Sequence, residues 1–289
     1  MFAAITIDLE LDLSRFSQYL QQLGIPHRIA EEGVNQILWV NSAQHATEVL
    51  DLFEHYKADT LPTLPTVTRV SQFHPGQLFR RFPLTLGLIT INILLFPVSM
   101  GLSDAEVSEL FKLMTFVSFD LRGDLVYFTD LEHMLDTHQY WRLLTPMFIH
   151  FGWLHIVFNL LWIWEVGRRI ELVNNASVLL LVTLGSSLLA NLLQYYLAGA
   201  SLFGGMSGVV FGYIGYSLVW SRLVPTKSMS LAPGLYIFMF VYLALGFTGA
   251  IDLLGLGSLA NGAHLGGLIG GLLIGTVAGL LFRPSPTTD

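Results

Sequence analysis

The 289-residue chain contains no cysteine, and only 12% of its residues are charged. Without cysteine it has no disulfide framework, no Cys-ligated zinc and no thiol nucleophile. Soluble domains carry roughly 25% charged residues, so about half of the usual solvating charge is missing. The net charge is −7 and no basic stripe is present, which argues against a nucleic-acid partner. The first residues lack a basic segment, so we expect no cleaved signal peptide.

Apolar residues make up 53% of the chain, and the mean hydropathy is +0.60. They gather in runs of about 20 residues, the length that crosses the hydrocarbon core of a bilayer. Residues 80–289 are therefore predicted to form an all-α membrane domain, a bundle of six transmembrane helices. The predicted spans are Phe82–Met100, Leu154–Val166, Ala176–Leu197, Phe203–Trp220, Pro233–Ile251 and Leu259–Phe282.

Residues 1–57 have a different pattern, which predicts a small soluble α+β domain without a catalytic constellation. Residues 58–79 contain three prolines and are predicted to be a linker. Apolar alternation indicates strands, and apolar spacing of three and four residues indicates helices. The predicted strands are Ala3–Leu9, His27–Glu32 and Gln36–Val40, and the predicted helices are Leu11–Leu23 and a segment from a cap at Asn41 or Ser42 to Tyr56.

Basic residues predict the orientation of the membrane domain, because cytoplasmic loops carry an excess of Lys and Arg. If the spans alternate, one side holds most of the bases beside the spans, and the other side holds the acid-rich segment 101–141. We therefore expect both termini to be cytoplasmic and the long first loop to face outward, with its aromatic stretches in the membrane interface. The bases on the predicted cytoplasmic side are Arg80, Arg81, Arg168, Arg169, Arg222, Lys227 and Arg283.

Four polar residues are predicted to lie at one depth in the second, fourth and sixth spans: His155, Asn159, Ser207 and His264. Each is about four to six residues, or roughly 6–9 Å, below the outer end of its helix. A polar group inside a span is costly and is a functional candidate by default. Any one of them alone could be a buried polar residue bonded to a carbonyl, but the four together favour a site.

Glycines predict which helices approach one another closely. The sixth span carries glycine at every fourth position from Gly267 through Gly271 to Gly279, and the fourth span carries Gly204, Gly208 and Gly212. Such stripes allow close contact between membrane helices. We expect the sixth span to pack on the fourth with His264 facing Ser207.

The chemistry of the four polar residues favours nucleophilic catalysis. A serine becomes a competent nucleophile when a neighbouring imidazole takes its proton, which assigns Ser207 and His264. His155, Asn159 and the main-chain N–H of Ser207 can donate hydrogen bonds to an oxyanion. No membrane carboxylate is placed to orient His264, so a Ser-His dyad is expected rather than a triad. The HExxH motif of zinc proteases and a pair of intramembrane aspartates are both missing, and neither a metal nor a cofactor is expected.

Four short motifs follow one another between residues 80 and 282: WR (Trp141, Arg142), HxxxN (His155, Asn159), GxSG (Gly205 to Gly208) and AHxxGxxxG (Ala263, His264, Gly267, Gly271). In this order they resemble the motifs of the rhomboid family of intramembrane serine proteases. The resemblance implies Ser207 as nucleophile and His264 as general base. It also implies that His155, Asn159 and the main chain near Gly205 stabilise the oxyanion. A soluble N-terminal domain before six spans resembles a bacterial member of the family, which implies the inner membrane and an active site that opens to the periplasm.

Further residues are expected to support the site. Phe211 stands where the family commonly has a tyrosine that stacks on the catalytic histidine, and it is expected to hold the ring of His264 by stacking. Arg142 is expected to anchor the first loop through carbonyls or a lipid phosphate. His150 is expected to have a structural role and Glu171 to contact a helix end. The fifth span, which has few close-packing glycines, is the candidate for a mobile helix.

The predicted function is hydrolysis of peptide bonds in single-pass membrane proteins, near the outer end of a locally unwound helix. The family resemblance adds a preference for small residues before the cut. Membrane lipids are expected partners, and the sequence leaves a homodimer open. One alternative is a catalytically inactive rhomboid-like chaperone or adaptor. Another is a small-solute transporter, although the polar cluster is off-centre and no inverted repeat with broken helices is evident.

Overall fold

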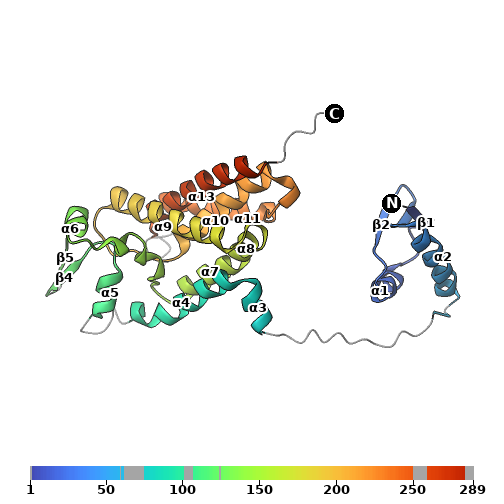
Figure 1. The fold of residues 1–289 in the computed structure, drawn as a ribbon, viewed down its shortest axis with the longest axis horizontal. Helices are drawn as coiled ribbons and strands as arrows, with labels where there is room; N and C mark the ends of the chain where they lie inside the picture. The colour runs from blue at the N-terminus through green and yellow to red at the C-terminus, as the bar shows by residue number, and fades with distance from the viewer. Residues whose placement is uncertain are drawn as a thin grey trace. The chain divides into compact units, whose positions relative to one another are not determined.

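The structure is a computed structural model that describes residues 2–58, 60–61, 75–100, 107–123, 125–249 and 259–283. The chain divides into two compact units, Met1–Phe73 and His74–Asp289 (Figure 1). The division falls within residues 58–79, the segment predicted to be a linker. At the end of that segment the chain is already helical, because α3 spans Pro75–Arg81.

The N-terminal unit has the predicted order of strands and helices. Its sheet has the antiparallel strand order β1-β3-β2. The first helix begins at Ser14 rather than Leu11, because the Asp12 side chain accepts a hydrogen bond from the Ser14 N–H at 2.8 Å. Ser42, and not Asn41, caps the second helix. The elements are β1 (Phe2–Asp8), α1 (Ser14–Gln22), β2 (His27–Glu32), β3 (Asn35–Val40) and α2 (Ala43–Lys57).

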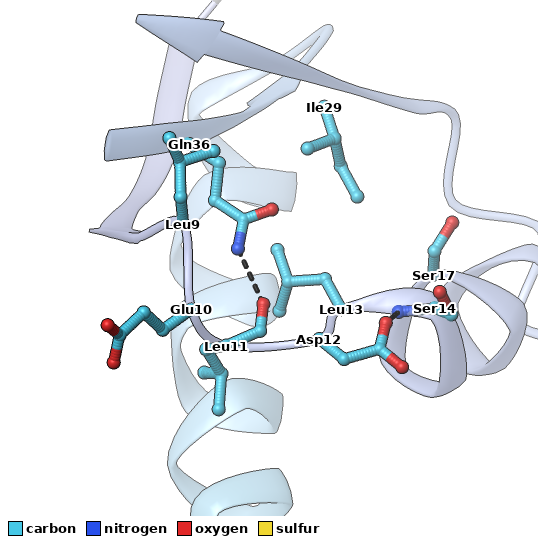
Figure 2. A pocket seen from close by; sticks show the side chains of 9 residues that line it. All are labelled: Leu9, Glu10, Leu11, Asp12, Leu13, Ser14, Ser17, Ile29 and Gln36. Atoms are coloured by element: carbon cyan, nitrogen blue, oxygen red, sulfur yellow. Dashed lines mark hydrogen bonds between the residues drawn. The ribbon is translucent and has the colours of Figure 1, made fainter. Parts of the chain in front are cut away.

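Period-two burial along β3 places the core of this unit between the sheet and its two helices. Leu38 and Val40 are fully buried and pack with Phe16 of α1 and Val49 of α2. The segment 9–14 crosses the end of the sheet and, with β2 and β3, lines a pocket of about 440 Å³ (Figure 2). Gln36 ties this segment to the sheet by donating from Nε2 to the carbonyl of Leu11 at 2.6 Å.

The C-terminal unit is a helical bundle with a short hairpin in its first long loop (Figure 1). The chain before the bundle centre forms α4 (Pro83–Met100), α5 (Glu109–Met114), β4 (Phe119–Arg122), β5 (Leu125–Phe128) and α6 (Leu131–Asp136). Two 3₁₀ turns follow, over Tyr140–Leu143 and Thr145–Phe148. The remaining elements are α7 (Trp153–Trp162), a π turn over Ile163–Gly167, α8 (Arg168–Asn174), α9 (Ala176–Ala198), α10 (Ser207–Leu223), a 3₁₀ turn over Pro225–Lys227, α11 (Pro233–Phe247) and α13 (Asn261–Phe282).

Three helices in the described part of the chain are long and apolar enough to cross a membrane by length and composition: α4, α9 and α13. The apolar helix α11 is shorter, and the last residues of the predicted fifth span, 250–251, lie outside the described residues. The second predicted span, Leu154–Val166, corresponds to α7 and most of the π turn, and α8 follows beyond its predicted end. The count of six spans therefore stays a prediction.

Two predicted helix starts are wrong by a few residues. The fourth span begins at Ser207 rather than Phe203, because Gly205 has φ +115°, a left-handed conformation that a helix cannot include. Gly204 consequently lies in the loop before α10 and packs against Ile149 and the carbonyl of Pro146. The last span begins at Asn261 rather than Leu259, whose carbonyl accepts a turn hydrogen bond from the Asn261 N–H.

Glycine on two faces of α13 lets this helix pack tightly against α10 and α9. A Cβ atom on Gly267 would collide with the carbonyl oxygen of Gly208, and one on Gly271 would collide with that of Gly212. The predicted contact between these two stripes is therefore present. A second stripe, which the sequence prediction did not use, faces α9 and consists of Gly262, Gly266 and Gly270.

A buried carboxylate caps the N-terminus of α4. Glu171, on α8, is 6% exposed and accepts hydrogen bonds from the main-chain N–H groups of Leu84 at 2.8 Å and Thr85 at 2.9 Å. The hydroxyl of Thr85 donates to the same carboxylate at 2.6 Å. A negative charge at a helix N-terminus satisfies N–H groups that have no acceptor inside the helix. Glu171 thus makes the helix-end contact that the sequence predicts.

The contact between the glycines of α10 and α13, here called the glycine seam, makes the stability of the bundle sensitive to one added methyl group. Gly271→Ala is expected to lower the stability of the detergent-solubilised protein by about 1–3 kcal/mol, because two helices must separate to admit the Cβ atom. Gly87→Ala on α4 is the matched control, since a Cβ there meets no atom within 4 Å. Thermal unfolding of both variants measures the difference. Equal unfolding midpoints would show that the seam tolerates a wider spacing.

Candidate active site

The seam between α10 and α13 brings together the serine and the histidine that the sequence predicts as partners. Ser207 is the first residue of α10, and His264 lies in the first turn of α13. His264 Nε2 lies 2.8 Å from Ser207 Oγ, a hydrogen-bonding distance. Gly208 and Gly267, which meet across the seam, follow these two residues closely in the sequence. The predicted approach of His264 to Ser207 is thus present, although Ser207 sits at the helix start.

Two aromatic rings lie against the imidazole of His264, which is 3% exposed. The centroid of the Phe211 ring is 4.8 Å from that of His264, with an interplanar angle of 35°. The ring of Tyr242, on α11, is 6.0 Å away. The sequence prediction identified the Phe211 contact, but it gave Tyr242 no place in the site. No hydrogen-bond partner reaches His264 Nδ1 within the described ranges.

Two further polar side chains converge on Gly205, in the loop before Ser207. A Cβ atom on Gly205 would lie 2.6 Å from His155 Nε2 and 3.6 Å from Asn159 Nδ2. Only glycine therefore permits this approach of the loop to α7. The N–H of Phe151 donates to His155 Nδ1 at 3.3 Å, so in the neutral ring the proton is on Nε2, the nitrogen beside Gly205.

Of two main-chain N–H groups near the serine, that of Ser207 can donate to a ligand and that of Gly205 is already hydrogen-bonded. The N–H of Gly205 donates to the carbonyl of Pro146 at 2.9 Å, so it is already engaged. The N–H of Ser207 belongs to the first turn of α10, where N–H groups have no acceptor inside the helix. Asn159 uses one amide hydrogen on the carbonyl of His155 at 2.9 Å, which leaves its second hydrogen for another acceptor.

His150 holds the loop before the serine through both ring nitrogens. It is completely buried, and its Nδ1 lies 3.3 Å from the carbonyl of Phe148. Its Nε2 accepts from the N–H of Met206 at 3.4 Å. These two contacts require a neutral ring with the proton on Nδ1. The imidazole therefore connects the segment before α7 to the residue that precedes Ser207.

Arg142 anchors the first long loop. The side chain is 3% exposed, and Nη1 donates to the carbonyls of Lys112 at 2.6 Å and Thr115 at 2.8 Å. Its Nε donates to the Gln139 side chain at 2.7 Å. Of the two partners that the sequence suggests for Arg142, carbonyls and a lipid phosphate, the structure contains the carbonyls. Arg142 acts at a distance from the serine, by holding α5 to the following turns.

Taken together, these contacts place a hydroxyl beside a basic imidazole, with hydrogen-bond donors from α7 and α10 nearby. This set of groups can support attack of a serine on a carbonyl carbon and stabilise the resulting oxyanion. No group of three or more His, Asp or Glu side chains that could hold a metal occurs among the residues that the structure describes.

Comparison with known proteins gives matches over both units. A family model described as "Rhomboid domain" matches residues 137–280, and one described as "Rhomboid N-terminal domain" matches residues 1–59. A protein named Rhomboid protease GlpG from Pectobacterium atrosepticum is 29% identical over 274 residues, which cover 90% of each chain. Proteins of the same name from Yersinia pestis and Yersinia pseudotuberculosis are 38% identical over 157 residues, or 53% of this chain and 55% of theirs.

Substitution of Gly205 tests the close contact with His155. Gly205→Ala combines the strain of a left-handed backbone, about 1–2 kcal/mol, with a collision at the imidazole ring. Gly199→Ala is the control, because Gly199 has φ +74° but open space around its Cβ position. We expect Gly205→Ala to destabilise the protein by about 1–3 kcal/mol more than Gly199→Ala in thermal unfolding. Equal losses would show that the loop moves away from α7 at little cost.

Proposed function

The chain belongs to the rhomboid family, which its Rhomboid domain, its Rhomboid N-terminal domain and its similarity to Rhomboid protease GlpG together establish, and from this premise we propose how it works. It is a serine protease of a bacterial membrane. Its Ser207 and His264 act as a catalytic dyad that hydrolyses peptide bonds within the membrane. The observation that carries this proposal is the 2.8 Å hydrogen bond between Ser207 Oγ and His264 Nε2.

Proton transfer follows from this geometry. Ser207 Oγ donates its proton to His264 Nε2 as the oxygen attacks the scissile carbonyl carbon. The protonated His264 then gives this proton to the leaving amine, which leaves an ester on Ser207. Water, activated by the same imidazole, hydrolyses the ester. Phe211 restrains the ring, in place of the carboxylate that orients the histidine of a triad.

The oxyanion of the tetrahedral intermediate is stabilised by donors from α7 and α10. His155 Nε2–H, the free amide hydrogen of Asn159 and the N–H of Ser207 are the proposed donors. Gly205 contributes by its lack of a side chain, which admits the ring of His155 beside the loop. Its own N–H would have to leave the carbonyl of Pro146 before it could serve as a donor.

The proposed substrates are single-pass membrane proteins that are cut near the outer end of their transmembrane helix, after a small residue. A helix hides its carbonyls in hydrogen bonds, so local unwinding must precede attack. The proposed topology has six spans in the inner membrane, cytoplasmic termini and a periplasmic opening. The distribution of bases supports this orientation, because the helix ends away from Ser207 carry Arg168, Arg222 and Arg283.

A catalytically inactive rhomboid-like chaperone or adaptor is the second candidate. Such a protein would bind transmembrane segments without hydrolysis and would have no need for the pair Ser207 and His264. The hydrogen bond between the two residues and the stacked ring of Phe211 favour the protease.

Removal of either member of the dyad is expected to abolish cleavage. Ser207→Ala and His264→Ala should each lower the cleavage rate of a labelled single-span substrate by at least about 100-fold to 10,000-fold. The assay uses the full chain in mild detergent and reports both the rate and the site of the cut. Thr276→Ala is the control, because Thr276 is exposed on α13 and bonds only within its own helix.

The outcomes separate the candidates. Cleavage by the parent and by Thr276→Ala, but by neither dyad variant, would support the proposed mechanism. Cleavage that persists in Ser207→Ala would exclude Ser207 as the nucleophile. A folded parent that binds several substrates and cleaves none would favour the chaperone or adaptor.

At position 211 the aromatic ring is expected to contribute more to the cleavage rate than the hydroxyl of a tyrosine would. Phe211→Leu removes the stacking partner of His264 and should reduce the rate by about tenfold, since aromatic pairs contribute about 0.5–1.5 kcal/mol. Phe211→Tyr keeps the ring and should remain within a few-fold of the parent. An increase of several orders of magnitude in Phe211→Tyr would contradict this assignment.

A further inference from the structure

Basic residues gather at the end of the bundle away from Ser207. The cap that Glu171 makes on α4 places the start of that helix, with the neighbouring Arg81, beside α8. The ring of Phe82 packs on Trp164, and the guanidinium of Arg168 lies over the Trp164 ring, 5.5 Å from its centroid. Two elements, α3 with Arg81 and α8 with Arg168, thus bring positive charge to one end of the unit.

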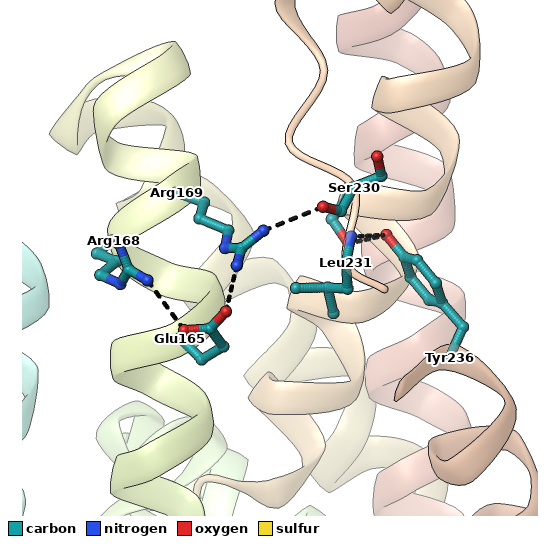
Figure 3. A network of polar contacts seen from close by, with 7 residues as sticks. Glu165, Arg168, Arg169, Ser230, Leu231 and Tyr236 are labelled. Atoms are coloured by element: carbon teal, nitrogen blue, oxygen red, sulfur yellow. Dashed lines mark hydrogen bonds and ion pairs between the residues drawn. The ribbon is translucent and has the colours of Figure 1, made fainter. Parts of the chain in front are cut away.

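At this end two arginines share one carboxylate (Figure 3). Arg168 Nη2 lies 3.0 Å from one oxygen of Glu165, and Arg169 Nη2 contacts the other oxygen. Arg169 Nη1 also donates to the carbonyl of Ser230 at 3.0 Å, which ties α8 to the segment before α11. Two positive charges and one negative charge leave a net charge of +1.

A pocket of about 290 Å³ lies between α8 and residues 228–230. Arg168 and Arg169 line it, together with Ser228 and Ser230, whose hydroxyl oxygens are 2.9 Å apart. The side chain of Arg168 is 32% exposed, so part of it is accessible to a ligand. A guanidinium presents five N–H donors, and Arg168 uses one of them, on Glu165. The pocket therefore offers unfilled donors and an excess positive charge.

The remaining wall of the pocket is apolar. Met229, which is 4% exposed, and Leu172 of α8, which is 53% exposed, both line it. Guanidinium groups and hydroxyls suit the oxygens of a phosphate. An exposed leucine next to them suits the first methylenes of an acyl chain. The combination matches an amphiphile better than a free ion.

We infer that this pocket binds the phosphate headgroup of an anionic membrane phospholipid. The phosphate oxygens accept hydrogen bonds from Arg168, and the hydroxyl of Ser228 completes the contact. The acyl chains leave the pocket over Leu172. Anionic lipids of the leaflet that faces clustered Lys and Arg residues would supply the ligand. The site does not depend on the proposed chemistry, because it lies at the opposite end of α10 from Ser207.

Short-chain lipids test this site on the full chain in a nonionic detergent. Dihexanoyl phosphatidylglycerol, dihexanoyl phosphatidylcholine and inorganic phosphate are titrated separately, and the thermal unfolding midpoint is recorded. At about 100 times its Kd the phosphatidylglycerol should raise the midpoint by about 5 °C. Phosphatidylcholine has the same phosphate with a compensating cation and should give little change.

Variants assign the effect to the pocket. Arg168→Gln should abolish the rise, and Leu172→Glu, an exposed change that places a negative charge at the rim, should abolish it as well. Arg283→Gln is the control, since it removes one positive charge from the same end but lies outside the pocket. Leu172→Glu keeps the test valid if Arg168→Gln does not fold.

Three results would overturn the inference. Equal rises with phosphatidylglycerol and phosphatidylcholine would show that the net charge of the headgroup is irrelevant. An equal loss in Arg283→Gln and Arg168→Gln would show diffuse attraction by the whole basic end. A full rise with inorganic phosphate alone would identify a free-anion site instead of a lipid site.

Discussion

The arrangement of the bundle depends on the contact between α10 and α13, where the lack of glycine side chains lets the two backbones touch. The carbonyl oxygens of Gly208 and Gly212 occupy the positions that Cβ atoms on Gly267 and Gly271 would need. Helices in such contact can neither rotate nor slide without a clash, because the backbones themselves interlock. The distance between Ser207 and His264 follows from this packing. The proposed dyad, which has no orienting carboxylate, would depend on this packing more than a triad would.

A second constraint is the need to satisfy helix ends where water is scarce. Glu171 accepts from the first N–H groups of α4, and Gln194 of α9 accepts from the N–H of Ala263 at 3.1 Å. Arg142 satisfies acceptors rather than donors, because its guanidinium donates to the carbonyl of Thr115 in the loop after α5. Unpaired buried main-chain groups are costly. The contact of Gln194 also fixes the first turn of α13, the turn that carries His264.

Helical periodicity was sufficient to predict that His264 approaches Ser207, because the four-residue spacing of glycine in α13 placed the two residues toward each other. The contact of Phe211 with the imidazole was predicted from the family resemblance. Periodicity has no signal for an irregular main chain, however. The left-handed Gly205 and its hydrogen bond to Pro146 shift the start of α10 to Ser207. For the same reason the engaged N–H of Gly205 was not foreseen.

Other features escaped prediction because their partners are distant in sequence. Tyr242 approaches His264 from α11. Apolar residues lie on all faces of this helix, so the sequence does not indicate which face packs against the bundle. In the sequence, Arg168 and Arg169 served only as markers of orientation, whereas the fold brings residues 228–230 to them. The number of spans is a third case. Length and hydropathy qualify α4, α9 and α13, whereas α10 has only 17 residues, most of which are buried in the bundle.

The two ends of α10 carry different chemistry. Ser207 is the first residue of the helix, which is about 25 Å long at 1.5 Å per residue. The basic pocket lies beside its last turn, where the Met229 N–H donates to the Ser221 hydroxyl at 3.0 Å. Between them α10 is packed on α13 by backbone contacts at Gly267 and Gly271 and, nearer the far end, by the Leu223 side chain against Gly279. A headgroup bound beside Arg168 therefore stabilises a rigid unit and does not reach the dyad by a local shift. Because a ligand changes an equilibrium only through its differential affinity for two states, such a lipid would support the bundle without regulating hydrolysis.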